Sequence, residues 1–244
     1  HPSMANNELS GPVLLSALIK YVRDNYKKSY YSYRFLFTPE TIGSLAYLSK
    51  NHINMKKRII AGFTLSCVGD ERNYSHVASP NYNLADQALE SALIGLKNVK
   101  AYSFLERGSD ERQYCSPNIE LPVCGFCRSK YGKYPEYHTS KDNFDVMTKK
   151  GLQGSFNVMK NIIDAFEIGL FPKSQTLGEP QLSKRNLYND ISDEENRNRL
   201  NLIAYSNGKN SIFDICKKLN KPLERVLLNI KKFKKLKLLK TKYL

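Results

Sequence analysis

Short apolar runs that alternate with helical patterns constrain the fold of this chain most strongly. Residues 59–68 (IIAGFTLSCV) form an apolar run that is rich in β-branched side chains and short enough to be a buried strand. Apolar residues recur at spacings of three and four over 42–50 before this run and over 86–96 after it, which predicts a helix on each side. Strands that alternate with helices are typical of an α/β domain with a largely parallel sheet.

The same pattern extends through the first part of the chain. In sheets of this kind ligands bind beyond the carboxyl ends of the strands. Glu40, Asp70 and His138 each follow a strand-like run, so we expect them at that edge of the sheet. The further expected elements are helices over 9–27 and 151–168 and short strands over 33–38, 102–105 and 122–127.

The C-terminal part of the chain has a different pattern. Residues 172–193 are polar and punctuated by proline and glycine, which is typical of a linker. The order of elements that follows is that of a winged helix-turn-helix. We therefore predict an α/β domain over residues 1–175, and a linker with a small winged-helix domain over 176–244. The elements expected in the second domain are helices over 194–205, 211–219 and 222–236 and a strand over 238–244.

Four motifs occur in a fixed order along the chain. They are HPSMANNELSG at 1–11, PETIGS at 39–44, SDERQYCSP at 109–117 and YHTSKDN at 137–143. In this order they resemble a bacterial aminopeptidase-like family, related to the zinc aminopeptidases, glutamate carboxypeptidases and glutaminyl cyclases and often encoded among polysaccharide-biosynthesis genes. The resemblance covers nearly the whole chain. It implies an α/β fold with a mostly parallel sheet flanked by helices.

The resemblance implies a zinc site with His1, Asn7, Glu40, Asp70 and His138 as its ligands. Imidazole nitrogen and carboxylate oxygen suit zinc, and a catalytic zinc keeps one position open for water. Asn7 stands where aminopeptidases place an aspartate that bridges two metals. Because a neutral amide does not bridge two ions as a carboxylate does, we expect one zinc rather than two. For Asp70, a ligand of a second metal and a cap of a loop remain open.

The sequence leaves the general base open. Aminopeptidases carry a Glu-Glu pair, a base followed by a ligand, where this chain has Pro39 and Glu40. Only one of the two roles can therefore be filled, and we interpret Glu40 as the ligand. Glu136, beside His138, is the substitute candidate for the base that takes a proton from zinc-bound water.

Three further residues are candidates for substrate binding. Asp110 and Arg112 belong to the third motif, and Tyr137 precedes the histidine of the fourth. An arginine can hold a substrate carboxylate through two parallel hydrogen bonds. The alternative for Asp110 and Arg112 is a structural ion pair.

Composition excludes several classes of protein. A hydrophobic content of 41% over 244 residues indicates a packed core and not a disordered chain. No apolar run approaches the ~20 residues of a membrane span, and there is no signal-peptide pattern. Five cysteines without a regular framework indicate the reducing cytoplasm. Cys124 and Cys127 lack a second cysteine pair, so we expect buried thiols there.

The chain opens on His1 and Pro2, which places an expected ligand at its very end. In the family's fold a strand and helices precede that ligand. We therefore expect an N-terminally truncated fragment of a longer parent. As a fragment it should be a poor enzyme, because a sheet without its first strands exposes backbone edges.

Positive charge is concentrated at the C-terminus. Residues 217–244 hold eleven lysines and arginines and a single acid, Glu224, so they carry ten of the fifteen excess charges. Lysines without interleaved arginines or aromatic residues indicate charge attraction rather than base reading. We favour a protein partner or a homo-oligomer over nucleic acid for the winged helix.

We therefore expect a zinc-dependent, aminopeptidase-like hydrolase of a peptide or amide bond, linked to surface polysaccharide biosynthesis. Two alternatives remain open. One is a non-catalytic metal- or ligand-binding scaffold with a peptidase fold, which Asn7 and Pro39 favour. The other is a nucleic-acid-binding regulator, which depends on the basic winged helix alone.

Overall fold

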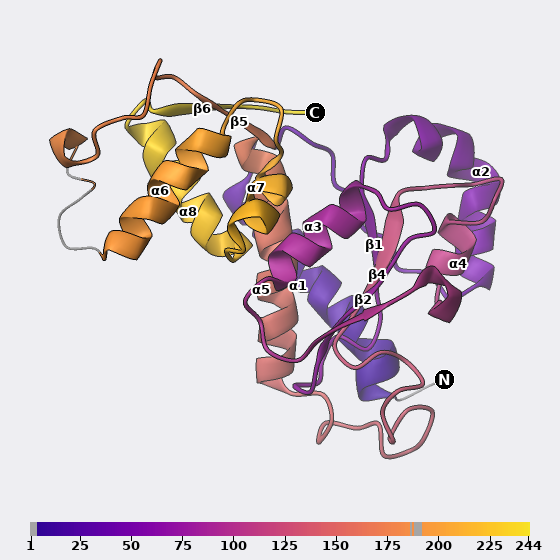
Figure 1. The fold of residues 1–244 in the computed structure, drawn as a ribbon. Helices are drawn as coiled ribbons and strands as arrows, with labels where there is room; N and C mark the ends of the chain where they lie inside the picture. Colours follow the sequence, from indigo (N-terminus) through magenta and orange to yellow (C-terminus); the bar gives the residue numbers. More distant parts are fainter. Residues whose placement is uncertain (1–3, 186, 188–191) are drawn as a thin grey trace. The chain divides into compact units, whose positions relative to one another are not determined.

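A computed structural model describes residues 4–185, 187 and 192–244 (Figure 1). The chain divides into two compact units. The first comprises His1–Glu90 and Leu96–Lys160, and the second comprises Ser91–Gly95 and Asn161–Leu244. His1, an expected zinc ligand, lies outside the described residues.

The first unit contains a four-stranded sheet with the order β1-β4-β2-β3. β1 pairs in parallel with β4, and β2 pairs in parallel with β3, whereas β2 and β4 are antiparallel. The expected α/β fold with a mostly parallel sheet is thus confirmed. The strands are β1 (Gly62–Leu65), β2 (Tyr74–Val77), β3 (Val99–Tyr102) and β4 (Val123–Cys127).

Helices surround this sheet much as the sequence predicts. Two glycines allow close packing beside the turn that follows β1. A Cβ atom at Gly11 in α1 would collide with the carbonyl oxygen of Leu65, and one at Gly151 in α5 with that of Gly69. The helices are η1 (Ala5–Leu9, a π-helix), α1 (Ser10–Asn25), α2 (Ile42–Arg58), α3 (Leu84–Leu93), η2 (Phe104–Glu106), α4 (Glu111–Tyr114) and α5 (Lys149–Ile168).

The expected strand over 33–38 is wrong, because these residues form no strand. The aromatic side chains that suggested a strand make other contacts. The rings of Tyr33 and Phe35 stack with centroids 6.4 Å apart, and the Arg34 guanidinium lies 5.9 Å from the centroid of the Tyr47 ring. A strand requires backbone pairing with a neighbour, which side-chain character alone does not supply.

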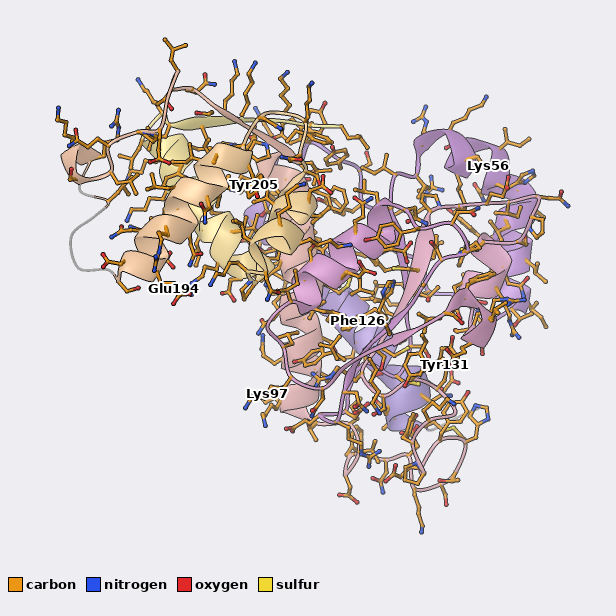
Figure 2. The ribbon with its side chains drawn as sticks, viewed as in Figure 1. Lys56, Lys97, Phe126, Tyr131, Glu194 and Tyr205 are labelled. Carbon is orange, nitrogen blue, oxygen red and sulfur yellow. The ribbon has the colours of Figure 1, made fainter. Side chains whose placement is uncertain are left out.

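Apolar side chains form separate clusters on the first unit. One joins α2 and α4 to the start of β4 and includes Leu48, Tyr114 and Val123. Another lies beyond the carboxyl ends of β1 and β4 and includes Cys67, Cys127, Tyr131, Tyr134 and Val146 (Tyr131 is labelled in Figure 2). The second cluster supports the loops that carry the candidate site.

The second unit has the winged-helix layout that the sequence predicts. Its helices surround a core that includes Ile212, Phe213 and Phe233, all fully buried. The linker expected from residue 172 is wrong at its start, since this segment lies within a strand that pairs antiparallel with the C-terminal strand. The elements are β5 (Phe171–Ser174), η3 (Ser183–Arg185), α6 (Asp193–Tyr205), α7 (Ile212–Leu219), α8 (Leu223–Lys235) and β6 (Leu239–Lys242).

Several basic side chains of this unit have structural partners. Lys234 Nζ donates to the carbonyl oxygen of Ile168 at 2.9 Å and to Thr241 Oγ1 at 2.8 Å. Lys231 Nζ lies 3.5 Å from the buried Asp164 carboxylate. The basic tail is therefore partly a packing element. Among the described helices, none combines the length and the apolar character needed to cross a membrane.

Candidate functional site

The N-terminal motif binds the turn that follows β1. Asn6 Oδ1 accepts the N–H of Gly69 at 2.8 Å, and Ser10 Oγ accepts that of Val68 at 2.9 Å. Cys67, in this turn, is fully buried and its Sγ donates to Asn7 Oδ1 at 3.5 Å. The first motif is thus held at the carboxyl end of β1.

A buried carboxylate joins the fourth motif to the first. Asp142 accepts the backbone N–H of Asn6 at 2.6 Å and that of Asn7 at 3.1 Å. It also accepts the Tyr134 hydroxyl at 2.8 Å. Asp142 therefore links the backbone of Asn7 to the loop that carries His138.

Asp70 is buried, and its carboxylate is occupied by hydrogen bonds. Oδ1 accepts the Ser129 hydroxyl at 2.8 Å and the Arg72 N–H at 2.9 Å. Oδ2 accepts the Ser129 N–H at 2.8 Å and Asn6 Nδ2 at 3.2 Å. Four donors fill the acceptor sites of a carboxylate. This geometry favours the loop cap over the metal ligand for Asp70.

Glu40 lies two residues before the start of α2, with a side chain that is 50% exposed. Burial raises the pKa of its carboxyl group, the nearby charges of Asp110 and Glu8 raise it further, and Arg112 opposes them. Arg112 Nη2 lies 3.8 Å from Glu40 Oε1. Glu8, Glu40 and Asp110 therefore concentrate negative charge at this end of the sheet, where a bound cation would reduce their repulsion.

Asp110 and Arg112 both bind the residue after Glu40. Asp110 Oδ1 accepts the N–H of Thr41 at 2.8 Å, and Arg112 Nη2 donates to the Thr41 hydroxyl at 2.7 Å. Both side chains thus make structural contacts, and in each case the partner is Thr41.

Tyr137 and His138 belong to the fourth motif, and their rings lie against each other. Their rings stack with centroids 3.9 Å apart and planes inclined by 16°. Burial raises the pKa of the Tyr137 hydroxyl to about 12, with further contributions from Cys67, Glu40 and Glu8. Tyr137 therefore lies close to these groups and stays protonated at neutral pH.

Three non-glycine residues around the site have left-handed backbones. Thr41, Cys67 and His138 have φ angles of 61°, 52° and 58°. Positive φ is unfavourable for a side chain with a Cβ, most of all a β-branched one, and such strain is often found at functional sites. Thr41 lies in the second motif, His138 lies in the fourth, and Cys67 lies in the apolar run over 59–68.

Glu136 lies differently from what its sequence position suggests. Its two carboxylate oxygens accept Arg72 Nη1 and Nη2, both at 2.8 Å. These hydrogen bonds hold the pKa of Glu136 below its usual value. A carboxylate in such a pair is a poor proton acceptor, so the geometry does not favour Glu136 as the base.

The donor types at this site fit one zinc ion better than two. His138 offers an imidazole and Glu40 a carboxylate, which are zinc ligands. Asn7 offers only an amide, whose Nδ2 donates to Glu8 Oε1 at 2.7 Å. Glu8, Tyr134 and Asp142 are functional candidates that the sequence reasoning missed, although each lies in or next to a motif.

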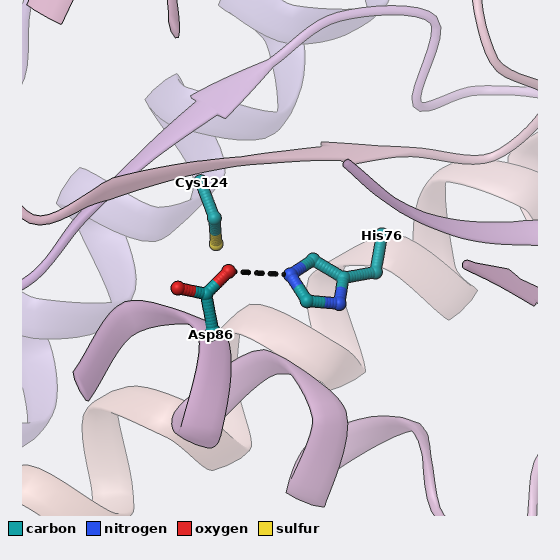
Figure 3. A group of neighbouring side chains, drawn as sticks. All are labelled: His76, Asp86 and Cys124. Atoms are coloured by element: carbon teal, nitrogen blue, oxygen red, sulfur yellow. Dashed lines mark hydrogen bonds and ion pairs between the residues drawn. The ribbon is translucent and has the colours of Figure 1, made fainter. Parts of the chain in front are cut away.

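A second group of possible ligands lies between strands β2 and β4 and helix α3 of the first unit (Figure 3). Among the described residues, His76, Asp86 and Cys124 have donor atoms that all lie within 4.8 Å of one another, and all three are buried. No other such set is found in the part of the chain that the structure describes. Glu40 and His138 do not belong to such a set.

Hydrogen bonds already occupy the Asp86 carboxylate of this group. It accepts His76 Nε2 at 2.8 Å, the N–H of Ser79 and that of Asn83 at 3.0 Å each, and the Ser79 hydroxyl. Burial raises the pKa of the Cys124 thiol well above its usual value, so it stays protonated. This arrangement suits a buried hydrogen-bond network at the start of α3 more than a metal site.

Two relatives with known sequence or structure come from Clostridium acetobutylicum. A polysaccharide biosynthesis protein described as having an aminopeptidase-like domain is 37% identical over 239 residues, covering 93% of this chain and 53% of that protein. A crystal structure named as a candidate peptidase has a TM-score of 0.83 at 34% identity, and the match covers 98% of this chain and 55% of that one. The chain thus spans about half the length of these relatives.

A more distant structure shows the wider fold. The aminopeptidase from Aneurinibacillus sp. strain AM-1 matches with a TM-score of 0.51 at 18% identity, over 65% of this chain and 39% of that one. At this identity the likeness concerns the fold alone. Together with the closer relatives it confirms the expected resemblance to aminopeptidase-like proteins.

Family models cover both parts of the chain. Residues 171–241 match a winged helix-turn-helix model. Residues 1–169, more than half of the chain, match the domain of unknown function DUF4910. The chain therefore belongs to the DUF4910 family and carries a C-terminal winged helix.

Proposed function

We propose that this chain carries the metal-binding site of a hydrolase that cleaves a peptide or amide bond, with one zinc ion, in surface polysaccharide biosynthesis. The observation that supports this most is the meeting of three motifs at the carboxyl end of β1. There Asn7 contacts Cys67, and the charges of Glu40 and Glu8 act on Tyr137. The names of the relatives support the same reaction class and pathway.

In this proposal Glu40 and His138 are the zinc ligands among the described residues, and Asn7 lies beside them. When bound, zinc would polarise the scissile carbonyl and lower the pKa of a water molecule. Asp142 holds the backbone of Asn7. Asp70 fixes Asn6 and so supports the site without binding the metal.

Other residues would handle the substrate and the proton. Tyr137 keeps its hydroxyl proton and can donate a hydrogen bond to a substrate carbonyl oxygen. Glu8 is the better candidate to accept a proton, because its charge acts on Glu40 while Glu136 is paired with Arg72. Arg112 has further N–H donors beyond those that contact Thr41, and these can meet a substrate carboxylate.

Zinc binding and hydrolysis together test this proposal. Zinc per chain would be measured after dialysis, and hydrolysis of leucine and alanine nitroanilides would be followed on the same samples. Glu40→Gln and His138→Ala should lose zinc and activity together. His52→Ala is the matched control, because His52 lies on α2 and its Nδ1 contacts the carbonyl oxygen of Leu48. A folded wild-type chain that binds no zinc under zinc-replete conditions would rule the proposal out.

A non-catalytic scaffold is the second candidate function. The amide of Asn7 and the proline before Glu40 favour it, since both replace carboxylates of the aminopeptidases. Asn7→Asp discriminates between the two. A zinc enzyme that has become mononuclear should gain metal per chain when the carboxylate is restored, whereas a scaffold should show no change.

A further inference from the structure

Thr41, which links Glu40 to α2, has an unusual backbone conformation. Its φ of 61° and ψ of −69° fall outside the regions that L-residues favour. Threonine is β-branched, so the steric cost at positive φ is higher than for most residues. A residue keeps such a conformation only where its surroundings hold it there. The contacts of Thr41 should therefore show what imposes it.

Two side chains of the third motif hold Thr41 from the start of α4. The Asp110 carboxylate accepts its backbone N–H at 2.8 Å, and Arg112 donates to its hydroxyl at 2.7 Å. One contact fixes the peptide that joins Glu40 to Thr41, and the other fixes the side chain. Together they restrict rotation of the chain directly after Glu40.

The residue between them anchors this segment to the first unit. Glu111 is 1% exposed. Its Oε1 accepts the N–H groups of Gly108 at 2.9 Å and Ser109 at 3.1 Å together with the Tyr131 hydroxyl, and its Oε2 accepts the Thr64 hydroxyl of β1 at 3.3 Å. A buried carboxylate with four donors is a rigid support. Asp110 and Arg112 are thus fixed relative to β1.

We propose that residues 109–112 form a clamp that fixes the backbone directly after Glu40 near the carboxyl end of β1, with Asp110 and Arg112 as positioning residues. Glu111 anchors the clamp, and Asp110 and Arg112 hold the strained backbone and the side chain of Thr41. The consequence for zinc rests on the proposed function, because Glu40 is the proposed ligand. The grip on Thr41 itself does not depend on zinc.

The clamp differs from the substrate-binding role that the sequence suggests for the third motif. A substrate-binding Asp110 would leave its carboxylate for the ligand, but here Oδ1 is taken by the Thr41 N–H. A positioning residue changes how well Glu40 is placed, so its loss should weaken metal binding. Loss of a group that orients a metal ligand without touching the metal typically changes metal affinity by about 10–100-fold.

Two measurements on the full chain test the clamp. The first is the zinc Kd, from competition with a chromophoric chelator. Asp110→Ala should weaken zinc binding roughly 10–100-fold. Asp24→Ala is the matched control, since it removes one carboxylate from the exposed side of α1 and should leave the Kd unchanged.

The second measurement is hydrogen exchange of the Thr41 N–H in the metal-free chain. Asp110→Ala removes its acceptor, so exchange should be faster by about tenfold or more. Unchanged exchange in Asp110→Ala would refute the clamp, whatever the zinc result. An unchanged zinc Kd with faster exchange would refute the positioning of Glu40. If exchange is faster in Asp110→Ala but the wild-type chain binds no zinc, the clamp is supported and the proposed function is refuted.

Discussion

Replacement of Asp86 by asparagine tests whether the buried His76–Asp86–Cys124 group is structural. Asp86 is fully buried and accepts four hydrogen bonds, one from His76, two from Ser79 and one from Asn83. Asparagine keeps one acceptor oxygen and turns an NH₂ group toward donors. Two bonds to a charged acceptor are lost, each worth about 1.5–3 kcal/mol.

We expect Asp86→Asn to lower the free energy of unfolding by about 3–5 kcal/mol, in line with the loss of two hydrogen bonds to a charged acceptor. For a chain of this size that corresponds to a fall in Tm of roughly 6–20 °C. Urea denaturation and thermal melting, both followed by circular dichroism, measure the two quantities. A loss below about 1 kcal/mol would show that the network contributes little.

The pH dependence of the same pair of proteins gives a second check. Burial alone would raise the pKa of Asp86, but the hydrogen bonds from His76 and Ser79 outweigh it and the pKa is lowered. Because the pKa is lower in the folded chain, its stabilisation is complete above the unfolded value of about 3.9 and is lost as the pH falls through the folded value. The difference between wild type and Asp86→Asn should therefore shrink in acid.

Zinc separates the structural account from the metal alternative. A metal that binds the folded chain raises its Tm by mass action. We expect added zinc to give the same Tm shift in wild type and Cys124→Ala. A shift that Cys124→Ala abolishes would instead assign the metal to this buried group.

Three further outcomes are expected. Lys234→Met should destabilise the second unit by about 1–3 kcal/mol in urea, because Lys234 donates to Ile168 and Thr241, whereas the exposed Lys235→Met should be near neutral. In a gel shift with random duplex at ~150 mM salt, the chain should not bind with a Kd below about a micromolar, the tight limit of ordinary non-specific binding; tighter binding would favour the regulator. A thiol reagent at pH 8 should label none of the five cysteines of the native chain within minutes, because all are buried and burial raises the pKa of Cys67 to about 12; rapid labelling of one would contradict this.

Local sequence patterns predicted most of the fold, and their failures have physical causes. The helix that begins at Ile42 and the strand β4 come from strong local periodicity. β2 was missed because it carries Ser75 and His76 at buried positions. Ser75 donates to the Arg128 carbonyl oxygen, which is distant in sequence, and His76 contacts Asp86, which lies on helix α3. The opposite error concerns residues 33–38. Their aromatic character suggested a strand, but a strand also needs a pairing partner, and these residues form none.

The candidate site shows the same limit. The motifs identified the loops that meet at the carboxyl end of β1, but not which carboxylates remain open there. Glu136 was chosen for its position beside His138, and its pairing with Arg72, 64 residues away, is not visible in the sequence. The choice for Asp70 depends in the same way on Asn6 and Ser129.

The most direct test of the account is anomalous diffraction at the zinc absorption edge from crystals of the chain grown with zinc. We expect a single strong peak beside the side chains of Glu40 and His138, and no peak in crystals of His138→Ala. A peak between His76, Asp86 and Cys124, or no ordered zinc in the wild-type crystals, would contradict the account.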